Sequence, residues 1–151
     1  GGSSIAHYDQ KLKFYIKKNN LENRVFIFTD ISNNFWFEIL NSSNLGLCFY
    51  KPTVLSHKFM AGTSQKFNNY LYFNKPMLVN NNLDFKSFKK KYDIFNIVAP
   101  NKPQQIAKGI NQIFENKKRY KQIKKNMSLA FSNTLNFEYQ FSKSYKKILE
   151  D

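Results

Sequence analysis

The sequence has little cysteine and no long apolar run. Among its 151 residues there is one cysteine, Cys48, so no disulfide can form within the chain. No apolar stretch approaches the roughly 20 residues that a helix needs to cross a bilayer. The N-terminus lacks the succession of basic, apolar and small residues that marks a secretory signal. These absences predict a cytoplasmic protein in a reducing setting, with Cys48 as a buried core thiol.

Acidic residues and histidines are also scarce, with ten of the former and two of the latter. They are scattered, so no pair of carboxylates is placed for general acid–base catalysis. No cluster of His, Cys, Asp and Glu has the spacing of a metal site. Asp84 is better placed as a helix cap than as a base. We therefore expect no metal and no cofactor, and the sequence identifies no catalytic residue.

Basic residues, by contrast, are abundant, and the formal net charge is +14. Such an excess indicates an anionic partner, either nucleic acid or a membrane surface. The lysines are spread along the chain, densest at 86–91 and 117–125, and do not interleave with aromatic residues as in single-strand-binding proteins. Lys, Asn, Phe, Ile and Tyr all have AT-rich codons. We therefore favour coding bias, with some attraction to the inner face of an anionic membrane, over a specific nucleic-acid partner.

Length and composition predict a single globular domain. Hydrophobic residues make up 42% of the chain and aromatic residues 17%, which excludes a disordered protein. A chain of this length can bury a substantial core. We expect one domain spanning residues 1–151, in which residues 1–4 are either an extraneous leader or the tail of a glycine loop.

Short apolar runs alternate with segments of helical periodicity. The apolar runs predict four strands, at 24–29, 45–50, 76–79 and 94–98, each covered on both faces. Helical spacing predicts helices at 5–16, 32–40, 64–74, 84–92, 103–114, 117–131 and 136–149. This alternation is typical of an α/β fold, a Rossmann-like parallel sheet of about four strands flanked by helices, with a helical C-terminus. Ligands in such sheets bind at the carboxyl ends of the strands.

The stretch from residue 62 to 79, GTSQKFNNYLYFNKPMLV, predicts a loop, a helix capped by Ser64 and a strand. Free main-chain N–H groups at the start of a helix attract an anion, and the Thr63 and Ser64 hydroxyls could add donors. Lys66 opposes the helix dipole unless a diphosphate is bound. The alternative is that Ser64 is only a cap and Lys66 only a solvated lysine, and on physical grounds alone this alternative is stronger.

The same stretch resembles the S-x-K-[LF]-x-E-Y-L-x-x-x-K-P-[VM] segment of many GT-B glycosyltransferases. The matching residues are Ser64, Lys66, Phe67, Tyr70, Leu71, Lys75 and Pro76. Residues 23–28 are similar to the family's N-R-V-x-F-x-G strand, and residues 35–52 to its L-x-x-x-D-[IL]-G-[LI]-x-x-[YF]-x-P segment. Residues 103–114 resemble x-E-L-A-x-A-I-x-x-[LF]. In order and spacing, the similarity covers the chain from about residue 10.

The resemblance implies the C-terminal, donor-binding half of such an enzyme. This half would bind a UDP- or GDP-sugar for transfer to a glycan or lipid-linked acceptor, which an N-terminal domain would hold. The positions implied to bind the nucleotide-sugar are Gly62, Thr63, Ser64, Lys66, Asn69, Tyr50 and Thr29. The alternative function is a non-catalytic basic module for nucleic acid or an anionic membrane surface.

Three positions depart from the family pattern. Asn69 and Ala61 stand where the family commonly has glutamates, and Thr29 replaces the glycine after its early strand. Asparagine can hydrogen-bond hydroxyl groups but supplies no negative charge. The resemblance therefore implies weak nucleotide binding, and an isolated domain that does not turn over.

Overall fold

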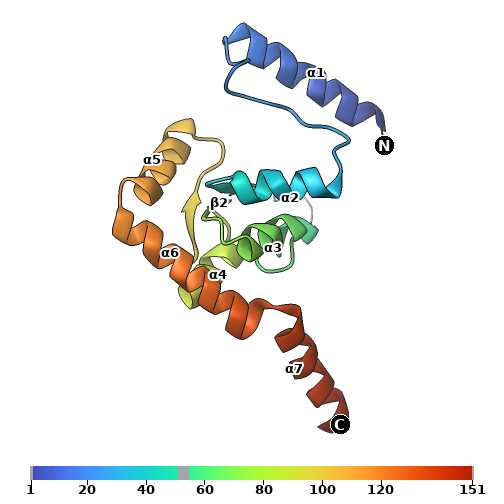
Figure 1. The fold of residues 1–151 in the computed structure, drawn as a ribbon, viewed down its shortest axis with the longest axis vertical. Helices are drawn as coiled ribbons and strands as arrows, with labels where there is room; N and C mark the ends of the chain where they lie inside the picture. Colours follow the sequence, from blue (N-terminus) through green and yellow to red (C-terminus); the bar gives the residue numbers. More distant parts are fainter. Residues whose placement is uncertain (1, 51–54, 151) are drawn as a thin grey trace. The chain divides into compact units, whose positions relative to one another are not determined.

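The computed structural model describes residues 2–50 and 55–150, and the chain divides into two units, Gly1–Trp36 and Phe37–Asp151 (Figure 1). The first unit begins with α1 (Gly2–Lys18), so residues 2–4 belong to a helix, while Gly1 lies outside the described residues. The predicted helix at 5–16 is confirmed. Residues 51–54 of the predicted loop also lie outside the described part.

The predicted strand at 24–29 is wrong. The segment follows α1 without regular secondary structure, and Val25, Phe26 and Phe28 are 42%, 67% and 53% exposed. Its rings contact one another and Phe35, with centroids 6.5 Å apart for Phe26–Phe28 and 5.5 Å for Phe28–Phe35. A strand needs a neighbour to pair its N–H and C=O groups. Among the described residues none pairs with this segment.

The second unit contains the sheet and most of the helices. A helix, α2 (Asn33–Ser42), begins in the first unit and ends in the second. The elements that follow are β1 (Gly46–Cys48), the short helix η1 (Leu55–Lys58), α3 (Gln65–Tyr72), β2 (Met77–Asn80), α4 (Leu83–Tyr92), β3 (Phe95–Val98), α5 (Pro103–Phe114), α6 (Lys117–Ala130), the π-helical turn η2 (Phe131–Leu135) and α7 (Phe137–Glu150).

The strands form a parallel sheet in the order β1-β2-β3. In its register Gly46 lies beside Met77, which lies beside Phe95. The structure thus confirms a parallel sheet flanked by helices, with three of the four predicted strands. Strands in chain order and side by side require crossover connections, which α3 and α4 supply.

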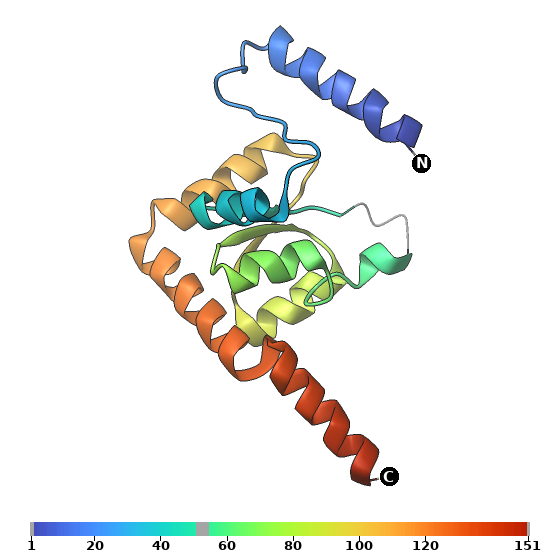
Figure 2. The ribbon, with the colours of Figure 1, turned by 45° about the vertical axis from the view of Figure 1, so that its right-hand side comes forward.

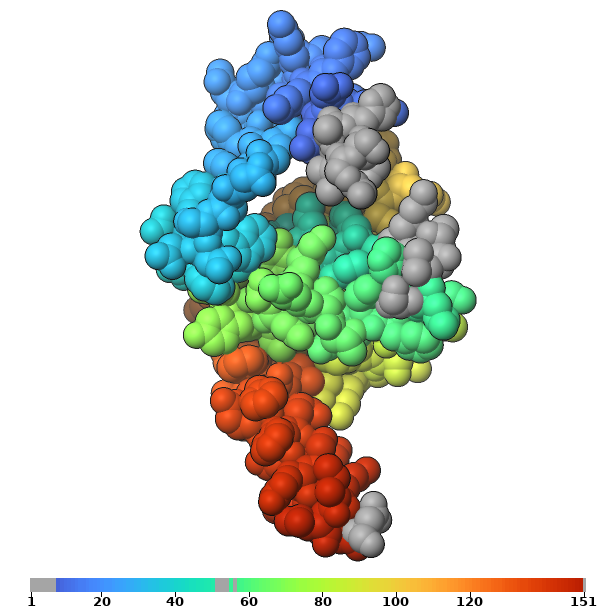
Figure 3. Space-filling model, turned by 90° about the vertical axis from the view of Figure 1, so that its right-hand side faces the viewer, coloured from blue at the N-terminus to red at the C-terminus, as the bar shows by residue number. Residues whose placement is uncertain are grey.

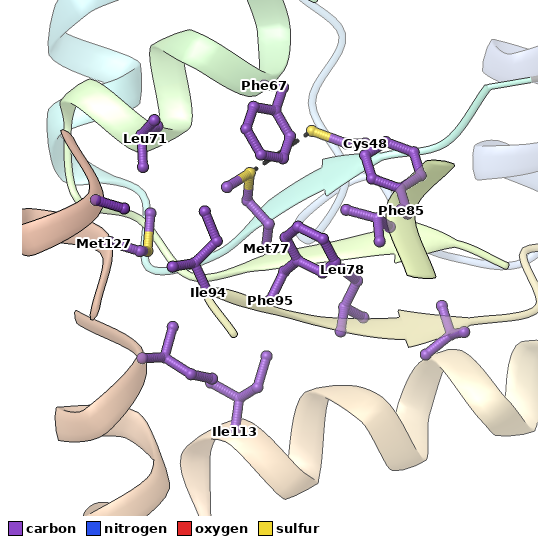
Figure 4. Packing of buried hydrophobic residues seen from close by; sticks show 14 residues of the cluster. Cys48, Phe67, Leu71, Met77, Leu78, Phe85, Ile94, Phe95, Ile113 and Met127 are labelled. Atoms are coloured by element: carbon purple, nitrogen blue, oxygen red, sulfur yellow. Dashed lines mark hydrogen bonds between the residues drawn. The ribbon is translucent and has the colours of Figure 1, made fainter. Parts of the chain in front are cut away.

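One face of the sheet is covered by α3 and α4 through a cluster of phenylalanines. Phe67 of α3 lies 6.1 Å from Phe85 of α4 and 5.9 Å from Phe95 of β3, measured between ring centroids. All three rings are fully buried. Figure 4 shows Phe67 and Leu71 pointing from α3 toward the sheet, with Ile113 of α5 on the other side.

The other face carries α5, which lies very close to the strands at Gly109. A Cβ atom at this position would lie 2.7 Å from Val98 Cγ1 and 3.2 Å from Leu78 Cδ2. Because those distances are shorter than normal carbon contacts, only glycine lets α5 approach this closely. Ile113, one turn further on, is fully buried below the sheet.

Helix α6 lies at the amino ends of the strands. Arg119 makes two hydrogen bonds with the carboxylate of Asp93, at 2.6 and 2.8 Å, and Asn126 donates to the Asp93 carbonyl at 3.2 Å. Asp93 immediately precedes the β3 region, and Asn74, which bonds Ser128, precedes β2. The predicted basic helix is confirmed, and it lies away from the carboxyl edge of the sheet (Figure 2).

The last helix, α7, follows η2 and is capped by Asn136, the first residue of the predicted helix, whose Oδ1 accepts from Tyr139 N–H at 2.7 Å. Every side chain from 137 to 150 is exposed. Within the described residues, no helix is both long and apolar enough to cross a membrane.

Candidate functional site

The carboxyl edge of the sheet is where the sequence predicts a site, and α3 begins there. Ser64 is the N-cap residue, with extended backbone and a side chain that accepts from Phe67 N–H at 3.4 Å. The turn before it depends on Gly62, whose φ of +77° is disfavoured for residues with a Cβ. Phe88 Cε2 would also lie 3.1 Å from such a Cβ. The predicted helix cap is therefore confirmed.

The two hydroxyl groups beside this helix start are already engaged. Ser64 is 9% exposed, and its hydroxyl shares a short hydrogen bond with the Tyr50 hydroxyl as well as capping α3. The Thr63 hydroxyl donates to the Phe59 carbonyl at 2.5 Å. Both groups thus hold the loop and the helix start in place rather than pointing to an empty position.

Positive potential at the start of α3 comes from the main chain and from Lys66. Among the described residues, no group accepts from the main-chain N–H of Gln65 or Lys66. The Lys66 side chain is exposed, and its Nζ lies 5.5 Å from the centroid of the Tyr50 ring. Two amides with no acceptor among the described residues, a helix dipole and one cation together form a site that suits an anion.

Tyr50 connects the end of β1 to both neighbouring elements. Its N–H donates to Asn80 Oδ1 at 3.1 Å, and its ring stacks on Phe85 with centroids 6.2 Å apart. Burial raises the pKa of Tyr50 to about 12, so the phenol stays protonated at neutral pH. Asn80 is 4% exposed and was not a candidate from the sequence, where the run of asparagines at 80–82 predicts only a turn.

Of the two remaining predicted site residues, Asn69 lies near the start of α3 and Thr29 lies in the other unit. Asn69 is half-buried on α3, three residues from Lys66, so the two share a face of the helix turned away from the core residues Phe67 and Leu71. Thr29 lies in the first unit, exposed and without regular structure, rather than at the end of a strand as predicted.

The start of α4 corrects the expected role of Asp84. The cap of this helix is Asn82, whose Oδ1 accepts from Phe85 N–H at 2.8 Å. Asp84 lies in the first turn, and its carboxylate accepts from Ala61 N–H at 2.7 Å. Asp84 therefore ties the loop before α3 to α4, a role that no local pattern in the sequence indicates.

A cavity of about 610 Å³ lies at the start of α4, in one of the loops where the sequence places ligand contacts. Its lining residues are Lys58, Phe59, Asn81, Asn82, Leu83, Asp84 and Ser87. Asn82 Nδ2 is buried there without a partner among the described residues. The lining thus combines an exposed apolar rim with amide groups and is nearly neutral.

Cys48 is a buried thiol, as predicted. Burial raises its pKa to about 12, so it carries no thiolate at neutral pH, and its Sγ lies 3.9 Å from Met77 Sδ. A thiol in this state is a packing residue, not a nucleophile. Across the described part of the chain, no three His, Cys, Asp or Glu side chains gather as they would around a metal ion.

No protein-family model, curated protein or solved structure matches the chain. Support for a function comes instead from motif spacing and from the geometry of the carboxyl edge.

Proposed function

We propose that the chain is the donor-binding part of a GT-B-like glycosyltransferase and binds the diphosphate of a UDP- or GDP-sugar at the start of α3. The amides of Gln65 and Lys66 and the Lys66 ammonium would hold the phosphate oxygens. Asn69, on the same face of α3, would reach a hydroxyl group of the sugar or ribose. Gly62, Thr63 and Ser64 would shape the turn, and Tyr50 would support it from beneath.

One observation carries the proposal: a cation occupies the first turn of a helix that begins at the carboxyl edge of a parallel sheet. Lys66 there opposes the helix dipole, which is unfavourable by roughly 0.3–1 kcal/mol in the absence of an anion. A diphosphate would reverse that sign, because it is attracted to both the lysine and the dipole. The motif spacing shared with GT-B enzymes is the second support.

Turnover would need more than these residues. The described carboxylates form no acid–base pair, so the proposal assigns acceptor binding and any general base to another domain. The protein would need no metal or cofactor, because positioning and charge stabilise the leaving diphosphate. The proposed location is cytoplasmic, because sugar nucleotides are present there and a free thiol such as Cys48 stays reduced.

The test is calorimetric titration of the full chain with a panel of UDP- and GDP-sugars. At least one sugar nucleotide should bind saturably. Lys66→Ala should lower the affinity for it roughly tenfold, which is the effect of one charge-assisted hydrogen bond. Lys108→Ala is the matched control, since it removes an exposed lysine from α5 on the opposite face of the sheet. It should leave affinity unchanged.

Amide chemical shifts locate the site in the same titration. Gln65 and Lys66 N–H resonances should move with the bound nucleotide, and the amides at the start of α4 should move less. The absence of binding across the panel, or equal weakening by both lysine variants, would contradict the proposal.

A further inference from the structure

Helix α7 presents an apolar stripe that no described residue of the second unit covers. The stripe follows helical spacing, and its residues are Phe137, Phe141, Tyr145, Ile148 and Leu149, each more than half exposed. Its rings stack in sequence along the helix, with centroids 5.7 Å and then 6.0 Å apart. Figure 3 shows α7, in red, uncovered along the side turned to the viewer. A face of this size indicates an interaction surface.

The direction of α7 is fixed at its base. Asn136 caps the helix and also donates to the carbonyls of Phe131 and Ser132, at 2.9 and 2.8 Å. The Thr134 hydroxyl donates to the Ala130 carbonyl at 3.0 Å. The helix therefore begins at a structured junction, and the rest of it is exposed and can lie on a partner.

The polar face of α7 is basic. Lys143, Lys146 and Lys147 fall on the side opposite the stripe, together with Glu150 at the end of the helix, whereas Glu138 lies in the first turn on the side of the stripe. The neighbouring helix α6 adds exposed lysines at 117, 118, 121 and 125. Both surfaces therefore carry net positive charge, consistent with the +14 of the chain.

We propose that α7 is an interfacial membrane helix, whose aromatic stripe enters the headgroup region of an anionic bilayer while its lysines contact the lipid phosphates. An aromatic and aliphatic stripe opposite a lysine-rich face is the composition of helices that lie in the plane of such an interface. The partner is anionic because the helix and its neighbour are cationic, and each lysine near the surface adds attraction. The inference is independent of nucleotide binding.

The test is co-sedimentation of the full chain with vesicles of equal phosphatidylglycerol and phosphatidylcholine, compared with phosphatidylcholine alone. The wild-type chain should bind the anionic vesicles and bind less as salt rises. Phe141→Glu, in the middle of the stripe, should weaken binding at least tenfold. Lys143→Gln combined with Lys146→Gln should weaken it roughly fivefold for each lysine. Because these side chains are exposed, circular dichroism should show all variants folded.

Leu83→Glu is the matched control, because it places the same charge on an even more exposed apolar residue at the start of α4. It should bind vesicles as the wild type does. Equal binding to neutral vesicles, unchanged binding of Phe141→Glu, or no binding by the wild type would overturn the proposal. A dimer that Phe141→Glu dissociates, without vesicle binding, would identify a second copy as the occupant. Retention on DNA that Phe141→Glu leaves intact, with no vesicle binding, would identify nucleic acid as the partner.

Discussion

Helices α3 and α4 begin at the same edge of the sheet and are built alike, but they carry residues of opposite charge at the second position after their caps. Each has a polar cap, Ser64 or Asn82, that accepts from the N–H of a buried phenylalanine three residues later. At the second position after the cap, α3 has Lys66 and α4 has Asp84. Asp84 compensates the helix dipole from within the protein, whereas Lys66 leaves it uncompensated. The comparison predicts that an anion is favoured at the start of α3 and not at the start of α4.

The largest expected effect tests whether Phe67 and Phe85 contribute equally to the stability of the protein. Phe67→Ala and Phe85→Ala should each lower the free energy of unfolding by about 3–5 kcal/mol, because both rings are fully buried and contact Phe95. Urea denaturation measures the difference. A loss below about 1 kcal/mol for either variant would show that the corresponding helix is not anchored through its phenylalanine.

The two caps should differ in how much each contributes to the free energy of unfolding. Ser64→Ala should cost about 2 kcal/mol, since it removes the cap and leaves the half-buried Tyr50 hydroxyl without its partner. Asn82→Ala should cost about 1 kcal/mol or less, because the amide nitrogen that it removes is already buried without a partner. Thermal unfolding of both variants checks the order. A larger loss for Asn82→Ala would contradict the assigned bonding.

The smallest effect concerns the far end of α4. Arg119 holds the pKa of Asp93 down to about 2, below its ordinary value, while no ion pair lies at the end of α3 among the described residues. A lowered folded-state pKa gives stability that is present above pH 4 and lost as pH falls toward 2. Because Asp93 is 44% exposed, the contribution should stay below about 1 kcal/mol.

Asp93→Asn checks this effect in urea titrations at several pH values. The variant should be less stable than the wild type at pH 6, and the difference should shrink toward pH 2. A constant difference across that range would mean that the carboxylate charge is not what stabilises this end of α4.

The sequence predicted the second unit well because its signals are local. Apolar runs at 45–50 and 94–98 contain β1 and β3, the run at 76–79 covers all of β2 except Asn80, and helical spacing located α3 to α7 within a few residues. Ser64 was recognisable as a cap, since capping depends on a side chain and an N–H a few residues apart. Most of what was local in the structure could be derived from the chain itself.

Apart from the Asn82 cap of α4, which is local and was assigned to Asp84, the failures involve partners distant in the chain. Residues 24–29 have the composition of a buried strand, but a strand also needs a paired neighbour, which composition does not reveal. Asp84 accepts from Ala61, 23 residues earlier, so its role could not be seen in the helix pattern. In the same way, Tyr50 occupies the Ser64 hydroxyl that the sequence left free for a ligand.

The position of the loop after β3, at the carboxyl edge of the sheet, depends on Gly109 of α5. No residue has a smaller side chain, so any substitution can only push α5 outward from Val98 and Leu78. The turn at 99–102, which leads from β3 into α5, would be displaced with it. The distance between α5 and the sheet is therefore set by the absence of a side chain at this one position.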